Sequence, residues 1–252
     1  MQPIYARLRE RARQIVSTFP LPDFYRVESA ACEFSEHFLK TDPAMKKLNR
    51  IVANHLDDTF GHGLQHALKV TIDAGALLNI EVQDAGCSRS TLERGMRVVQ
   101  SAGLLHDIKR KQREHAKLGA AHAREILKNF PLSLPEIEDV CRAIHNHEAF
   151  SRNMIATTAE GAMASDCLYD ADKFRWGPDN FTDTLWDMIS FYNPPLSKFM
   201  ARYPRGMEGL EKIKATFRTP TGKRYGPQFI DLGQAIGQKL YEVIQAEFSD
   251  QI

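Results

Sequence analysis

The 252-residue chain lacks the features that mark several large classes of protein. No apolar run approaches the roughly 18 residues that a membrane-spanning helix needs, so we expect no membrane partner. Basic and acidic residues nearly cancel, 33 against 32, and this balance makes nucleic acid an unlikely main partner. No GxxxxGK[ST] motif is present, which argues against ATP-driven chemistry.

Cysteine is also scarce. The four cysteines are far apart and form no CxxC pair: Cys32, Cys87, Cys141 and Cys167. This spacing predicts neither a disulfide framework nor a zinc knuckle. Cysteines spaced in this way are typically small buried side chains of a protein in a reducing compartment.

The N-terminal stretch 1–19, MQPIYARLRERARQIVSTF, is basic and amphipathic, as a transit peptide would be. It lacks the serine-rich composition of such peptides, and Glu10 stands among its arginines. We therefore expect an ordinary surface helix here and a cytoplasmic protein.

Strand-like alternation is rare, whereas apolar residues recur with the 3.6-residue period of helices along the whole chain. The sequence therefore predicts an all-α fold, a single compact multi-helix bundle. We expect an N-terminal helical extension over residues 1–57, a core over 58–176, and a C-terminal helical extension over 177–252 packed on the core. The stretch RTPTGKRYGP is predicted to be a loop before a closing helix over 230–248.

Capping residues indicate where three of the core helices begin. Asp58 or Thr59 can cap the first, and Ser90 or Thr91 can cap the second. Ser133, followed closely by a proline, is expected to open the third.

The most informative polar residues interrupt apolar helical faces. His106 and Asp107 follow the apolar run 102–105, and His106 continues the helical stripe that contains Val99 and Gly103. The pair predicts either a buried His–Asp hydrogen bond or two ligands of a shared metal ion. A metal would satisfy both groups and offset their desolvation.

Other helices supply residues that could complete such a site. His66 lies near the start of a helix, four residues after His62. We favour His66 as the ligand, because His62 lies in a glycine-flanked turn where substrate contact or capping is expected. Asp172 follows apolar residues of its helix at the spacing of one inward face, whereas Asp166 and Asp170 are expected at the surface.

Two further histidines continue apolar stripes. His115 shares a stripe with His122, and His115 is the better candidate ligand. His147 continues the inward stripe of its helix, whereas His145 follows an adjoining stripe. We therefore prefer His147 as a metal ligand and keep His145 as an alternative. Any of these histidines could also be an ordinary buried residue of the core.

The ordered set of one histidine, a His-Asp doublet and a distal aspartate resembles the HD-domain superfamily of metal-dependent phosphohydrolases. The stretches GHGLQHALKV, GLLHDIKR and DADKF resemble the motifs of that family and span about residues 58–176. The resemblance implies an HD-domain fold for this core. It also implies a divalent metal ion held by four residues: His66, His106, Asp107 and Asp172.

Some branches of this family add histidines after the doublet and bind two metals. HAKLGA and NHE resemble the added motifs and imply His115 and His147 as further ligands, for one or two metals per chain. His115 follows Asp107 by only eight residues, a shorter interval than these branches usually show, and Asn146 stands where they often have a histidine. The GYP motif of the branch that cleaves cyclic-di-GMP is missing, which argues against that substrate.

Imidazoles and carboxylates without thiolates suit Mn, Fe, Co, Ni, Mg or Zn. Such a metal lowers the pKa of bound water and polarises a phosphoryl oxygen, and Asp107 is expected both to bind the metal and to orient the water. The resemblance implies a phosphohydrolase that cleaves a monoester or diester of a small molecule, with a nucleotide as the first candidate. One alternative is a catalytically silent module that senses a nucleotide; another is a helical scaffold.

Basic residues are expected to contact the substrate phosphate. Arg110 stands where the family often has a basic residue after the doublet, and Lys173 directly follows Asp172. Together with Asp107, these two are the expected catalytic residues. The predicted loop offers three more candidates for substrate binding, although a solvated basic loop is the simpler interpretation of them: Arg218, Lys223 and Arg224.

Overall fold

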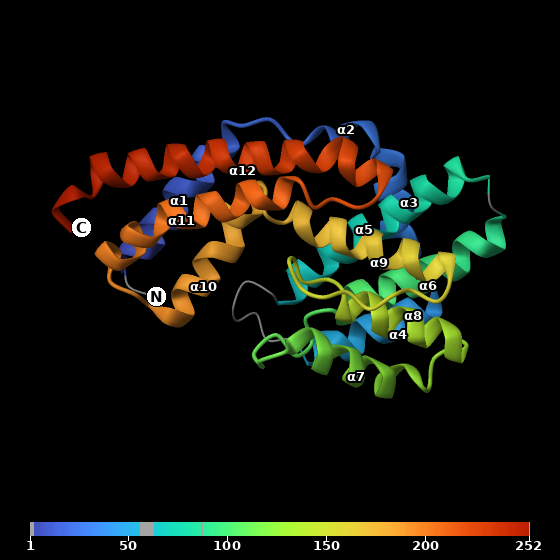
Figure 1. Cartoon of the computed structure of the whole chain (residues 1–252). Coiled ribbons are helices and arrows are strands. Elements are labelled where there is room, and N and C mark those ends of the chain that lie inside the picture. Colours follow the sequence, from blue (N-terminus) through green and yellow to red (C-terminus); the bar gives the residue numbers. More distant parts are fainter. Residues whose placement is uncertain (1–2, 56–62, 87, 252) are drawn as a thin grey trace.

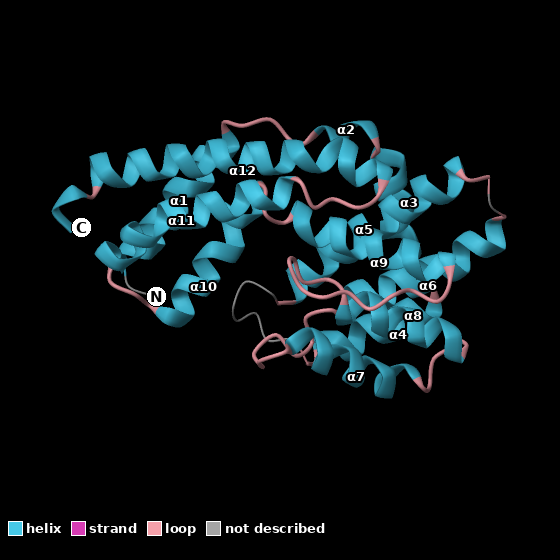
Figure 2. Ribbon diagram, viewed as in Figure 1, coloured by secondary structure: helices cyan, strands magenta, loops and turns pink. Residues whose placement is uncertain are grey.

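The computed structural model describes residues 3–55, 63–86 and 88–251, and every regular element within these ranges is helical (Figure 2). This confirms the predicted all-α fold. The α-helices are α1 (Pro3–Ser17), α2 (Asp23–Val27), α3 (Ser29–Thr41), α4 (Pro43–Ala53), α5 (Leu64–Asp84), α6 (Arg89–Leu105), α7 (His115–Leu127), α8 (Leu134–His145), α9 (Ala159–Phe174), α10 (Leu185–Tyr192), α11 (Leu196–Lys214) and α12 (Pro220–Glu247). A π-helical turn, η1 (Asn180–Thr184), precedes α10, and a 3-10 turn, η2 (Ser249–Gln251), follows α12.

The centre of the molecule is built from α5, α6, α8 and α9. Helix α5 packs against α6 and α9, and α8 packs against α9 and α7. Helix α12 runs along one side, where it packs against α1, α9 and α11 (Figure 1). None of the described helices is long and apolar enough to cross a membrane. The predicted boundary at residue 176 falls between α9 and η1, the one at residue 57 lies outside the described residues, and the division into a core and two extensions stays a prediction.

A glycine lets α5 and α6 approach closely near the predicted ligands. A Cβ atom added at Gly103 would lie 2.8 Å from the Cα atom of Thr71, a distance that no real Cβ tolerates. Gly103 is one turn before His106, and Thr71 is five residues after His66. The close crossing therefore brings the end of α6 to the start of α5, where the two histidines lie.

The stretch predicted as a loop is instead the beginning of α12. The Thr219 side chain caps this helix by accepting from the Gly222 N–H, and Pro220 occupies the first turn, where its missing N–H is not needed. The prediction that Asp170 lies at the surface was also wrong, because Asp170 is fully buried. Its carboxylate accepts hydrogen bonds from the backbone N–H groups of Arg218 and Thr219 and from the Thr219 hydroxyl.

The other helix starts agree only in part with the predicted caps. Ser133 caps α8 as expected, in a reciprocal capping box with Glu136. Helix α6 is capped by Ser88 rather than by Ser90 or Thr91. Helix α5 begins after Gly63, and the predicted caps at residues 58 and 59 lie outside the described residues.

We expect Asp170→Ala to lower the free energy of unfolding by about 3 kcal/mol, because buried N–H groups at the start of α12 would lose their acceptor. Urea titration followed by circular dichroism measures the change. Asp166→Ala is the matched control, because Asp166 precedes Asp170 by one turn of α9, is partly exposed and has Arg218 3.7 Å away. Equal losses in the two variants would contradict the capping role.

Candidate metal centre

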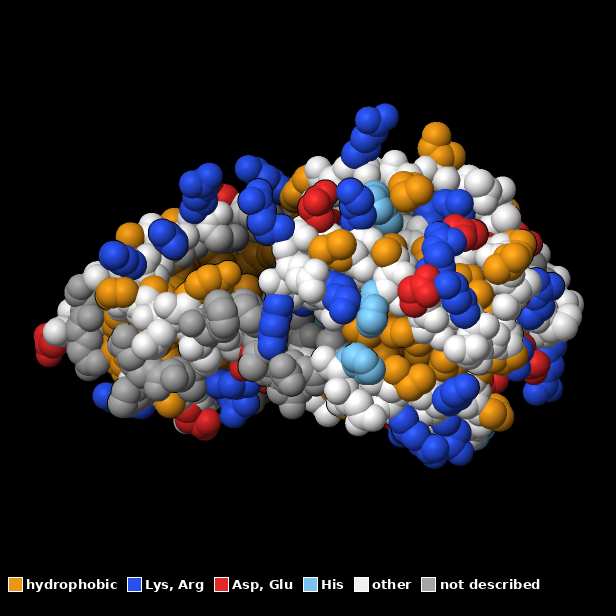
Figure 3. Space-filling view, turned by 90° about the horizontal axis from the view of Figure 1, so that it is seen from below, with side chains coloured by type: hydrophobic (Ala, Val, Ile, Leu, Met, Phe, Trp, Pro, Cys, Tyr) orange, Lys and Arg blue, Asp and Glu red, His pale blue; other side chains and the backbone are white. Residues whose placement is uncertain are grey.

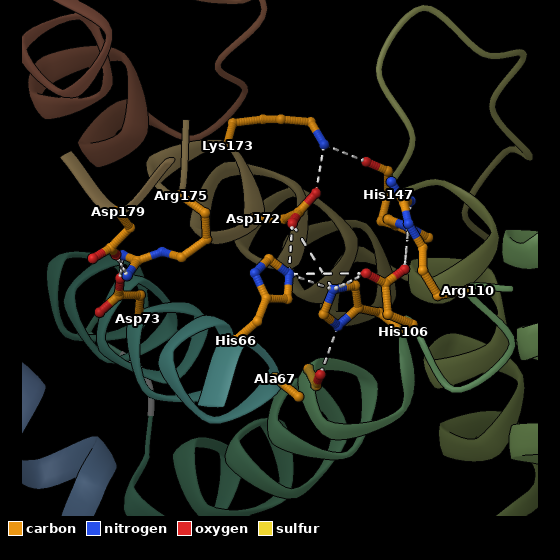
Figure 4. A network of polar contacts seen from close by, with 12 residues as sticks. His66, Ala67, Asp73, His106, Arg110, His147, Asp172, Lys173, Arg175 and Asp179 are labelled. Carbon is orange, nitrogen blue, oxygen red and sulfur yellow. Dashed lines mark hydrogen bonds and ion pairs between the residues drawn. The ribbon is translucent and has the colours of Figure 1, made fainter. Parts of the chain in front are cut away.

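The histidines and aspartates predicted as metal ligands meet in one buried cluster at the ends of five helices. Each lies in the first or last turn of its helix or directly after it, where the chain changes direction. These six residues are His66 of α5, His106 and Asp107 after α6, His115 of α7, His147 after α8, and Asp172 of α9. Figure 4 shows His66, His106, His147 and Asp172 converging from different helices.

The first group surrounds the Nε2 atom of His66. This atom lies 3.3 Å from His106 Nε2 and 3.3 Å from Asp172 Oδ1. Asp107 Oδ2 is 3.5 Å from His106 Nε2 and 3.9 Å from His66 Nε2. Two imidazole nitrogens and two carboxylate oxygens therefore point toward a common position.

The hydrogen bonds of His106 show which of its nitrogens is free to bind a metal. Its Nδ1 is 2.7 Å from the Gly103 carbonyl oxygen, which can only accept, so Nδ1 carries the proton. Burial lowers the pKa of His106 to about 4, although Asp107 and Asp172 oppose this shift, so the ring is neutral near pH 7. The unprotonated Nε2 thus faces His66 Nε2 and the carboxylates of Asp107 and Asp172, an arrangement that a cation between them would stabilise.

The second group shares Asp107 with the first. Asp107 Oδ1 is 3.5 Å from His115 Nε2 and 3.5 Å from His147 Nε2, and the two histidine nitrogens are 3.3 Å apart. His147 Nδ1 donates to the Ile144 carbonyl oxygen at 2.6 Å, which repeats the arrangement of His106. Asp107 therefore directs one carboxylate oxygen to each group.

The structure brings His147, and not His145, into the cluster. His145 ends α8, and its Nδ1 is 3.4 Å from the Asn146 side-chain oxygen. The side-chain amide of Asn146 is directed to the backbone of Met154 instead. It donates to the Met154 carbonyl oxygen and accepts from the Met154 N–H. Asn146 thus holds the loop that follows His147.

Arg110 lies against the second group. Its Nη1 atom is 2.8 Å from His115 Nε2 and 3.7 Å from Asp107 Oδ1. The guanidinium is partly exposed, so it can neutralise Asp107 and also reach a ligand beside the cluster. A second metal ion would compete with this guanidinium for the same two ligands.

Lys173 is buried beside Asp172. Its Nζ donates to Asp172 Oδ2 at 2.5 Å and to the His147 carbonyl oxygen at 2.9 Å. Burial would raise the pKa of Asp172, but the Lys173 ammonium and a hydrogen bond from His66 hold it well below its usual range. Asp172 is therefore an anion at neutral pH, as a metal ligand must be.

A cavity of about 340 Å³ opens beside the cluster, a volume that suits a small ligand. Its wall contains atoms of His66, Asp107 and Asp172, so a bound molecule would touch both carboxylates of the first group. Three cationic residues also line it: Arg110, Lys173 and Arg175. Cationic side chains therefore lie beside the carboxylates of Asp107, Glu148 and Asp172 in the cavity wall.

Arg175 is a residue of the site that the sequence analysis missed. It is buried and donates to Asp73, Asp179 and the Tyr25 hydroxyl, which fastens the end of α9 to α5 and α2 (Figure 4). A signal was present, because Asp73 interrupts the apolar face of α5 seven residues after His66, on the same side of the helix. The network holds Asp172 opposite His66.

The basic residues of the predicted loop are not found in the wall of this cavity. The Arg218 guanidinium lies 3.5 Å from the centre of the Tyr169 ring and donates to the Asn146 carbonyl oxygen. Lys223 and Arg224 are exposed on α12. A phosphate contact by these three residues therefore has no support from the geometry. His62 lies outside the described residues.

Comparisons with known proteins give one match among solved structures. No family model matches the chain, and no curated protein does. The chain is similar to the crystal structure of a predicted HD superfamily hydrolase from an uncultured Thermotogales bacterium, with 20% sequence identity and a TM-score of 0.45. The match covers 82% of this chain and 93% of the other.

Proposed function

We propose that this protein is a metal-dependent hydrolase of the HD type that cleaves a phosphate ester of a small molecule. One observation carries the proposal: the unprotonated Nε2 of His106 faces His66 Nε2 and the carboxylates of Asp107 and Asp172 in a buried position. Two imidazole nitrogens and two carboxylates converge in this way where a cation binds them.

The donor set fits a divalent ion. His66, His106, Asp107 and Asp172 would hold it, and Gly103 orients one ring through its carbonyl oxygen. Nitrogen and oxygen donors without thiolates suit Mn, Fe, Co, Ni, Mg or Zn. A bound divalent ion supplies a lowered pKa for water and a polarised phosphoryl oxygen.

The residues around the cavity match the charge changes of phosphate ester hydrolysis. In the reaction ROPO₃²⁻ + H₂O → ROH + HPO₄²⁻, the P–O bond to the alcohol breaks and a bond from water oxygen to phosphorus forms. One proton of the water passes to the alcohol. Lys173 and Arg110 can neutralise the negative oxygens of the phosphoryl group as the bonds change. Asp107 is suited to orient the attacking water.

Two questions of mechanism stay within this proposal. His115, His147 and Asp107 could hold a second ion if Arg110 moves away from His115. A monoester would give the alcohol and inorganic phosphate, whereas a diester would give an alcohol and a phosphomonoester that keeps its second ester bond; in both reactions water replaces one ester oxygen on phosphorus. The family resemblance makes a nucleotide the first candidate substrate.

Elemental analysis and a phosphate-release screen test the proposal. We expect wild-type protein to retain a divalent ion and to hydrolyse at least one ester in a panel of nucleotides, p-nitrophenyl phosphate and bis-p-nitrophenyl phosphate. His106→Ala should lower turnover by more than about 100-fold, since even partners outside the ligand shell cost about 10–100-fold. His145→Ala is the matched control and should retain most activity.

Two results would overturn the proposal. Either wild-type protein reconstituted with each metal binds none, or His106→Ala leaves phosphate release unchanged. Metal binding and stabilisation by nucleotides without any turnover would favour the sensor alternative instead.

A further inference from the structure

A second cavity adjoins the one beside the metal cluster. It has a volume of about 210 Å³ and lies between α10 and α11. The two cavities share a wall formed by Trp176, Asn180 and Met188. Trp176, a large aromatic side chain in both linings, is 39% exposed.

Helix α11 runs past both cavities. Ile213 and Gly209 line the cavity beside the metal cluster, whereas Gly206, Tyr203 and Phe199 line the second. From Ile213 to Phe199 the helix rises by about 20 Å, at 1.5 Å per residue. Figure 3 shows a hollow that contains hydrophobic side chains on the half of the molecule that carries α10 and α11. The two adjoining cavities together therefore line α11 from the side of the metal ligands to Phe199.

The two ends of this space differ in chemistry. The end near the cluster carries Arg110, Lys173 and the carboxylates, whereas the second cavity is lined mainly by hydrocarbon: Phe181, Leu185, Phe199, Met207 and Leu210. Tyr203 offers no free donor there, because its hydroxyl donates to the Gly237 carbonyl oxygen at 2.8 Å. The polar groups that remain in its described lining are the Arg202 side chain, the shared Asn180 amide and the indole N–H of the shared Trp176.

This lining favours a hydrocarbon over a nucleobase. A base buried in the second cavity would leave most of its donors and acceptors without partners, and unpaired buried polar groups are costly. An alkyl or prenyl chain has no such groups and gains from every methylene that it removes from water. The difference in chemistry between the two ends matches a molecule with a charged head and an apolar tail.

We propose that the substrate is the phosphomonoester of a hydrophobic alcohol, with its phosphate at the metal cluster and its chain in the second cavity. The inference rests on the proposed function and specifies its substrate class. The reaction is the hydrolysis written above, in which R is the apolar chain. Phosphate and the free alcohol are the products.

Gly206 is in the lining of the second cavity, so a larger side chain at this position is expected to reduce its free volume. A Cβ atom added at Gly206 meets nothing within 4 Å, so Gly206→Leu places its side chain in open space. Leucine also favours a helix more than glycine does. Gly206→Ala is the matched control, since it makes the same change of backbone preference with a much smaller side chain.

The experiment compares butyl phosphate with decyl phosphate, each below its micelle-forming concentration, as substrates of the metal-loaded protein. We expect wild type to have a kcat/KM at least tenfold higher for the decyl ester. Gly206→Leu should reduce this ratio at least tenfold, and Gly206→Ala should reduce it less than threefold. An unchanged ratio in Gly206→Leu overturns the inference, as does a wild-type preference for nucleoside monophosphates over decyl phosphate.

Binding of phosphonates, which are not hydrolysed, separates this inference from the proposed function. Calorimetry should give decylphosphonate at least tenfold tighter binding than butylphosphonate, with the difference reduced in Gly206→Leu. If decylphosphonate binds more tightly in this way but no ester is hydrolysed, the apolar site is supported and the proposed hydrolase function is contradicted. Turnover of esters with equal affinity for the two phosphonates would leave the hydrolase function standing and overturn the apolar site.

Discussion

Asp107→Asn is expected to remove bound divalent metal and to lower turnover by more than about 1,000-fold. Asp107 directs Oδ2 to His106 and Oδ1 to His115 and His147, so it is the one residue that belongs to both described ligand groups. The amide keeps the shape of the side chain but loses its negative charge and one acceptor oxygen. Elemental analysis of the purified variant and single-substrate kinetics measure the two losses.

Matched histidine variants distinguish the two groups. His147→Ala should lose only an ion held by the second group and should retain the ion at His66 and His106. His145→Ala, two residues away and outside the cluster, should bind metal as wild type does. If Asp107→Asn kept a full complement of metal, Asp107 would not be a ligand. A melting temperature of the metal-free variant close to that of metal-free wild type shows that its losses are not caused by unfolding.

Arg175→Met is expected to lower the free energy of unfolding by about 3–5 kcal/mol. Both Arg175 and Asp73 are almost completely buried, and Tyr25 donates to the same Asp73 oxygen at 2.8 Å. Removal of the guanidinium leaves the Asp73 carboxylate buried without its cation. Urea titration measures the loss of unfolding free energy. The slope of free energy against urea concentration also shows whether the variant keeps a compact folded state.

The loss should depend on pH in a defined direction. Burial raises the pKa of Asp73 even in the wild type, where Arg175 opposes the shift. Without Arg175 the pKa rises further, and a raised carboxyl pKa makes stability fall as the pH rises through it. Arg175→Met should therefore be more destabilised, relative to wild type, at pH 8 than at pH 5.

Two controls show whether the unpaired charge is the cause. Arg89→Met breaks an ion pair with Glu93 in which the arginine side chain is 90% exposed, and it should cost less than about 1 kcal/mol. The double variant Arg175→Met with Asp73→Leu removes both charges and should regain part of the stability. A single variant no less stable than Arg89→Met would contradict the network's role.

The cluster was the part of the protein that local sequence predicted best. His66, His106, Asp107 and Asp172 each interrupt an apolar helical face, and a polar residue facing the core needs a partner there. The helical period indicates which side of each helix faces inward. It favoured His147 over His145 without excluding His145, because those residues lie on different stripes of α8 and its extension.

The errors concern contacts between distant parts of the chain. Arg218–Pro227 has the glycine and proline content of a loop, but the Asp170 carboxylate from α9 stabilises it as the start of α12. Asp170 was expected at the surface for the same reason, since its partners lie about 50 residues away in sequence. Arg175 was missed because its carboxylate partner Asp73 comes from another helix.

Local sequence thus established that the chain is helical and predicted the inward direction of the histidines and aspartates of the cluster, though not of Asp170, because helix period and side-chain polarity act over one or two turns. The distances between those residues depend on how the helices pack. The approach of Gly103 to Thr71 brings His106 beside His66, and packing of α10 and α11 forms the apolar cavity next to the cluster. Neither arrangement has a local signature, since each depends on side-chain volumes contributed by helices far apart in the chain.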